Sequence, residues 1–220
     1  MIAPRTAARP ALRVLRALAA GLLLALAGCT LVSQPEIPAF TATETIYILN
    51  ERGWMNWIGV VGHAALVVPG PAEELVQFGF GDHSYMESEG AESLAPTLRI
   101  VTLGWFFPSR GTIQRKSLGP IASLPLAERR EEVEKRSGMR TLELVVPLAD
   151  ALRLSRALEA DYVACGGAVP GGPELTPVAD RQYHLAFENC QSFVAEWLAV
   201  IGLDTDTFRV LPRWSFWFVI

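Results

Sequence analysis

The stretch that decides the fold is Tyr183-His184-Leu185-Ala186-Phe187-Glu188-Asn189-Cys190-Gln191-Ser192-Phe193-Val194-Ala195-Glu196-Trp197. Asn189 is a favourable helix N-cap because its side-chain oxygen can accept a hydrogen bond from an unpaired backbone N–H of the first turn. The apolar residues after it recur with helical spacing at Phe193, Val194, Trp197, Leu198 and Ile201. Gly202 lies where a glycine commonly ends a helix. The pattern therefore predicts a helix whose first residue is Cys190.

Cys190 in this position is a candidate nucleophile. The partial positive charge at a helix N-terminus favours the thiolate, which is the reactive form of cysteine. The candidate base is His63, in an apolar run over residues 60–68 that reads as a strand. Alternation places His63 on the same face as Ala65 and Val67. The imidazole would take the thiol proton before the thiolate attacks an acyl carbon. A hydrogen-bonded core histidine is the alternative interpretation of His63.

The first 28 residues are typical of an export signal. They combine four arginines with an apolar run over residues 17–27, which is too short to span a bilayer as a stable helix. The run ends in Leu26-Ala27-Gly28-Cys29, which resembles a bacterial lipobox. That resemblance implies cleavage before Cys29, acylation of Cys29 (palmitate among the acyl chains) and attachment to the membrane. Thr30 in place of an Asp favours the outer membrane, with the protein facing the periplasm. An ordinary cleaved signal and an uncleaved anchor are the alternatives.

The net charge and the histidine spacing argue against two classes of function, nucleic-acid binding and metal binding. The net charge of the whole chain is −4, and removing residues 1–28, with four Arg and no acid, makes it −8. An acidic chain without a basic cluster argues against nucleic-acid binding. The histidines, His63, His83 and His184, lack the spacing of metal ligands, so we expect neither a metal nor a cofactor.

We expect a tether over residues 29–44 and one folded domain over residues 45–220. The expected strands cover residues 45–49, 60–68, 75–78, 98–107 and 141–146, and the expected helices cover 127–135, 150–162 and 190–201. Residues 166–177 read as a Gly/Pro loop, and the aromatic tail over residues 208–220 reads as a strand or an apolar flap. Two cysteines follow Cys29, so a disulfide between Cys165 and Cys190 is an alternative. Such a disulfide would leave Cys190 without the thiol that a nucleophile needs.

Two segments resemble a known superfamily. Asn189-Cys190-Gln191-Ser192-Phe193-Val194 is similar to the Asn-Cys-x-x-Phe-Val block of lecithin:retinol acyltransferase-like proteins, in the circularly permuted branch of the NlpC-type, papain-like superfamily. Gly62-His63-Ala64-Ala65-Leu66-Val67-Val68 resembles the histidine strand of that branch, which precedes the cysteine helix. The resemblance implies an α+β, papain-like (permuted NlpC-type) fold, in which an antiparallel sheet packs against the helix carrying the cysteine.

The resemblance also implies roles for further residues. Gln77 in Leu75-Val76-Gln77-Phe78 stands where the branch usually carries the His or Glu that orients the catalytic histidine. Asp82 is the alternative orienting residue. Tyr183 is a candidate oxyanion donor, and His184 is interpreted as supporting or structural.

Two functions remain open. The first is a cell-envelope lipoprotein acting as a cysteine hydrolase or acyltransferase, through a thioester, on cell-wall peptides (peptidoglycan) or lipid acyl groups. The second is a non-catalytic envelope lipoprotein that uses the same fold as a binding or assembly module.

Overall fold

The computed structural model describes residues 29–32, 36–39, 41–52, 62–87, 107–167, 175–184, 188–203, 205–206 and 215–219. The expected strand over residues 98–107 lies almost entirely outside these ranges. Within the described residues no helix is long and apolar enough to cross a membrane.

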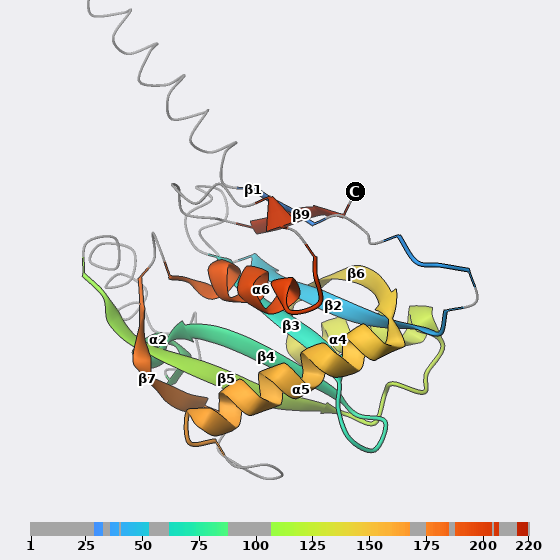
Figure 1. Cartoon of the computed structure of the whole chain (residues 1–220). Helices are drawn as coiled ribbons and strands as arrows, with labels where there is room; N and C mark the ends of the chain where they lie inside the picture. Colours follow the sequence, from blue (N-terminus) through green and yellow to red (C-terminus); the bar gives the residue numbers. More distant parts are fainter. Residues whose placement is uncertain are drawn as a thin grey trace, which may run out of the picture.

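The fold is α+β and is built on a six-stranded antiparallel sheet (Figure 1). Its strand order is β6-β2-β3-β4-β5-β7. The bounds are β2 Thr43–Arg52, β3 Gly62–Pro69, β4 Leu75–Asp82, β5 Ser109–Gly119, β6 Arg140–Pro147 and β7 Leu175–Tyr183. The predicted antiparallel sheet with a helix packed on it is therefore confirmed at this level.

The two faces of the sheet carry different helices. Helices α5 (Leu148–Ala164) and α6 (Cys190–Ala199) lie over one face, which we call the helix face (Figure 1). Its core includes Ala64, Leu66, Val68, Phe78 and Phe80 from the central strands. The opposite face, which we call the far face, packs Tyr47, Leu49, Ala65, Val67 and Leu75 against α4 (Leu126–Ser137) through Val133. The central strands thus carry buried apolar residues on both sides.

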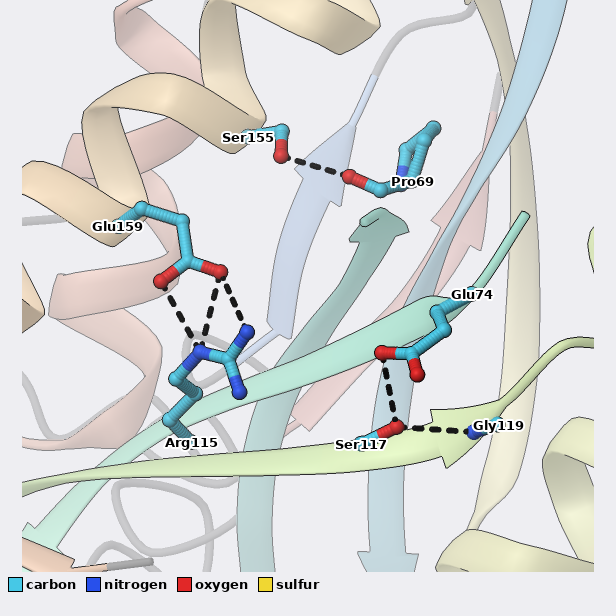
Figure 2. Close-up of polar contacts among 7 residues, drawn as sticks. All are labelled: Pro69, Glu74, Arg115, Ser117, Gly119, Ser155 and Glu159. Carbon is cyan, nitrogen blue, oxygen red and sulfur yellow. Dashed lines mark hydrogen bonds and ion pairs between the residues drawn. The ribbon is translucent and has the colours of Figure 1, made fainter. Parts of the chain in front are cut away.

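Polar contacts fix α5 on the sheet. Arg115 of β5 donates to both carboxylate oxygens of Glu159 on α5 at 2.8–3.0 Å (Figure 2). One turn earlier on α5, the hydroxyl of Ser155 donates to the carbonyl of Pro69, at the end of β3, at 2.6 Å (Figure 2). A bidentate guanidinium–carboxylate pair has a fixed geometry, so it sets the position of the helix along the strand.

The predicted helices and most predicted strands are confirmed, with shifts of a few residues at their ends. Strand β5 was not predicted, because its consecutive polar side chains Arg115, Lys116 and Ser117 interrupt the alternation typical of a half-buried strand. The start of β7, which contains Pro177, was predicted to be a loop. A short helix α2 (His83–Glu87) follows β4 directly.

The start of the predicted tether is a strand. Residues Cys29–Val32 form β1, which lies between β8 (Thr205–Asp206) and β9 (Ser215–Val219) in a second, three-stranded sheet. The interpretation of residues 29–44 as a tether throughout is therefore wrong for Cys29–Val32, and it is also wrong for Thr43 and Glu44, which begin β2. The terminal strand that was one of two expectations for the tail is present as β9.

Candidate active site

The N-terminus of α6 has the predicted cap. The Asn189 side-chain oxygen accepts from the backbone N–H groups of Gln191 at 2.9 Å and Ser192 at 3.1 Å. The Ser192 hydroxyl accepts from the Asn189 backbone N–H at 3.0 Å, which completes a capping box. Cys190 is accordingly the first residue of the helix.

Cys190 points into the apolar core of the helix face. It is 3% exposed and belongs to the same cluster as Ala64, Phe80 and Phe193. The ring of Phe193, one turn further along α6, stacks on Phe80 with a centroid distance of 3.9 Å. The thiol is therefore held in the layer between α6 and strands β3 and β4.

His63 lies on the far face. A Cβ placed on Gly79 would be 3.0 Å from Nε2 of His63 and 3.6 Å from Cβ of Ala65, which belongs to the far-face core. The imidazole therefore lies over Gly79 of the neighbouring strand. Burial lowers the pKa of His63 from 6.5 to about 4, so the ring is neutral at pH 7. Its Nε2 atom has no hydrogen-bond partner within the described residues.

Gln77 shares the far face with His63. It pairs in register with Val67, a far-face core residue, and lies two residues before Gly79 on β4. The side chain is 4% exposed, and Oε1 finds no partner in the part of the chain that the structure describes. The structure thus brings the predicted base and its predicted orienting residue to one surface.

The structure does not bring His63 and Cys190 together. Successive strand residues face opposite sides of a sheet; Ala64 contributes to the helix-face core with Cys190, whereas His63 lies beside Ala65 on the far face. The thiol and the imidazole are thus separated by the thickness of the sheet. The predicted proton transfer between them has no direct path in this arrangement, which corrects the pairing inferred from the sequence.

Asp82 lies on the face opposite His63. It pairs with Gly111, where an added Cβ would meet the ring of the helix-face residue Phe80 at 2.7 Å. Asp82 is 2% exposed and accepts a hydrogen bond from the Ser84 hydroxyl at 2.5 Å. It therefore does not orient His63, and it shares a face with Cys190 instead.

Tyr183 and His184 lie at the end of β7, just before α6. Tyr183 belongs to the core cluster that contains Cys190, and its ring centroid is 6.0 Å from that of Phe80. His184 and Glu188 exchange backbone hydrogen bonds of 2.8 and 2.9 Å, which close the chain tightly ahead of the helix. This supports the structural interpretation of His184, whereas the oxyanion role of Tyr183 stays a prediction.

Cys165 and Cys190 are not joined in a disulfide, so the alternative that would block the nucleophile is not formed. Cys165 caps the C-terminus of α5 and packs against the helix-face core. Across the described ranges, no group of three or more His, Cys, Asp or Glu side chains is arranged to hold a metal ion.

Two glycines and a threonine complete the far-face site and were not among the predicted site residues. Gly79 and Gly81 leave room for the His63 ring and for the Met86 side chain, whose Sδ lies 2.6 Å from where a Cβ on residue 81 would be. Thr112 pairs with Gly81, is fully buried, and has no partner for Oγ1 within the described part of the chain. The signal for this surface was the alternation Gly79-Phe80-Gly81, which leaves the far face of β4 without side chains at residues 79 and 81.

No family model, no curated protein and no solved structure matches this chain.

Proposed function

We propose that the protein is a lipid-anchored component of the bacterial cell envelope whose permuted papain-like domain acts as a binding or assembly module. In this proposal Cys190 and His63 do not act as a catalytic pair. The order of the histidine strand before the cysteine helix, and the packing of that helix on an antiparallel sheet, support the papain-like assignment. Acylation at Cys29 and an outer-membrane position facing the periplasm belong to the same proposal.

The observation that carries this proposal is the placement of Cys190 and His63 on opposite faces of the sheet. A cysteine hydrolase needs its nucleophile and its base within hydrogen-bond reach.

The far-face site is the candidate binding surface of the module. It gathers three buried polar atoms, His63 Nε2, Gln77 Oε1 and Thr112 Oγ1, none of which has a partner among the described residues. Buried polar groups are nearly always hydrogen-bonded. Gln77 Oε1 is an acceptor, and the neutral imidazole and the hydroxyl can each accept or donate. The site therefore suits a ligand rich in amide and hydroxyl groups, a description that fits cell-wall peptides and glycans.

A hydrolase or acyltransferase working through a Cys190 thioester is the second candidate. The capped N-terminus of α6 favours it, because a thiol at the first helical position gains from the helix dipole. It would require a rearrangement that brings His63 and Gln77 to the face of Cys190.

One experiment separates the two candidates. The acylated protein is incubated with purified peptidoglycan and with a fluorogenic thioester, while sedimentation with the peptidoglycan measures binding. The module proposal predicts co-sedimentation that weakens in His63→Ala and Gln77→Ala but not in Cys190→Ala, with no turnover in any sample. Turnover that disappears in Cys190→Ala would establish the hydrolase instead.

A further inference from the structure

A thioether and an imidazole meet over the glycines of β4. A Cβ placed on Gly81 would lie 2.6 Å from Sδ of Met86 and 3.9 Å from Cε1 of His63. Nε2, the next atom of the same ring, lies 3.0 Å from the corresponding position on Gly79. The Met86 and His63 side chains therefore converge on one glycine-lined stretch of the far face.

This convergence follows from the local fold. His63 lies near the start of β3, and Met86 lies in α2, which follows β4 directly and contacts both β4 and β5. Because residues 79 and 81 are glycines, the ring and the thioether can approach the backbone of β4. His63 and Met86 are both half-buried as whole residues, so an ion has a route to them from solvent.

Two buried polar atoms beside Gly81 lack hydrogen-bond partners among the described residues. One is Nε2 of His63, and the other is Oγ1 of Thr112, which pairs with Gly81 across the sheet. Buried polar atoms are nearly always hydrogen-bonded. Side-chain packing would account for the position of Met86, but it does not account for the unpartnered ring nitrogen next to the thioether.

The two donor types favour a soft cation. A methionine thioether is a polarizable, uncharged donor of the kind that selects Cu(I), and imidazole also binds copper. Zn(II) is instead held by thiolate, imidazole and carboxylate groups. We propose that His63 and Met86 form a Cu(I)-binding site on the far face, with Nε2 and Sδ as the ligands.

The copper site goes beyond the proposed function and does not depend on it. It requires neither acylation of Cys29 nor binding of cell-wall material. The spacing of the histidines does not predict it, because its second ligand is a methionine.

Competition for Cu(I) tests the proposal on the mature chain, residues 29–220, under anaerobic conditions. Cys29→Ser, Cys165→Ser and Cys190→Ala remove every thiol that would compete for the ion, and bicinchoninate is the competing chelator. We expect this thiol-free parent protein to withdraw Cu(I) from the chelator. X-ray absorption at the copper edge should then show a sulfur and an imidazole neighbour, and the sulfur can come only from methionine.

Two substitutions in the parent protein each remove one proposed ligand. Changing a residue that merely supports a metal ligand costs about 10–100-fold in affinity, so His63→Gln and Met86→Leu should each weaken Cu(I) binding by at least about tenfold. The matched control is Met139→Leu, because Met139 is a buried methionine of the far-face core that lies between α4 and β6. This control should leave the affinity unchanged, and circular dichroism checks that each variant is folded.

Three results would overturn the copper site: Cu(I) that stays with the chelator, copper without a sulfur neighbour, or equal affinities in Met86→Leu and Met139→Leu. The first two concern the parent protein and do not depend on the folding of a ligand variant. Sedimentation of the same parent protein with peptidoglycan keeps the two proposals apart. Binding of peptidoglycan without Cu(I) would contradict the copper site alone, and binding of Cu(I) without peptidoglycan would contradict the cell-wall proposal alone.

Discussion

The imidazole of His63 covers Gly79 so closely that a Cβ on residue 79 would lie 3.0 Å from Nε2. We expect Gly79→Ala to destabilise the fold by about 1–3 kcal/mol, because the ring or the strand must shift to admit the methyl group. Urea unfolding measures the loss. In a His63→Ala background the same change should cost less, with a coupling of roughly 0.5–3 kcal/mol. Strictly additive effects would mean that the ring does not lie over Gly79.

Burial of neutral His63 makes stability depend on pH. Its pKa is lowered to about 4 in the folded state from 6.5, so the unfolded chain binds more protons between these values. The contribution of neutral His63 to the free energy of unfolding is fully present above about pH 6.5. It is lost as the pH falls toward 4, and the loss amounts to at most about 3 kcal/mol. Urea unfolding at pH 7 and pH 4.5 measures it. The difference in the free energy of unfolding between pH 7 and pH 4.5 should be smaller in His63→Gln than in the wild type. An unchanged difference would contradict the burial of this imidazole.

The Arg115–Glu159 pair is expected to contribute more to stability than the ion pairs at the surface. Its side chains are 11% and 23% exposed. Glu159→Ala should cost roughly 3 kcal/mol, because it leaves a mostly buried guanidinium without its partner. The matched control is Asp150→Ala, since Asp150 pairs with Arg153 on the same helix while the two are 28% and 52% exposed. That change should cost at most about 1 kcal/mol. Equal losses in thermal or urea unfolding would show that Arg115 does not fix α5.

The cap of α6 is open to a direct test. Asn189→Ala removes the acceptor for two backbone N–H groups and should lower the free energy of unfolding by about 1 kcal/mol, within a range of roughly 0.5–2. Glu196→Gln, on the exposed side of the same helix, changes a surface pair with Arg181 and should cost less than about 0.5 kcal/mol. A loss in Asn189→Ala no larger than in this control would argue against the capping box.

Local features of the chain could be predicted from the sequence. The N-cap at Asn189, the start of α6 at Cys190 and the alternation that places His63 with Ala65 and Val67 follow from neighbouring residues alone. The common face of His63 and Gln77 followed from the resemblance and agrees with the register of β3 and β4.

The face on which α6 packs could not be predicted in the same way. Strand β3 offers an apolar surface on both sides, with Ala64 and Leu66 on one and Ala65 and Val67 on the other. A strand buried on both faces reads as one continuous apolar run, so the sequence contains no signal for the side that receives Cys190. The pairing of Cys190 with His63 assumed that the helix packs its N-terminus against the face of β3 that carries His63, and the helix packs on the other face.

The separation of Cys190 from His63 is tested most directly by the pH dependence of thiol alkylation. The rate of haloacetamide labelling at Cys190 is measured against pH in a Cys165→Ser background, with and without His63→Ala. If the two side chains lie on opposite faces of the sheet, both proteins will label with the same pH midpoint, because the imidazole does not interact with the thiolate. A midpoint that rises by about one pH unit or more toward the free-thiol value near 8.5 when His63 is removed would contradict the account. It would show that the two residues form a catalytic pair.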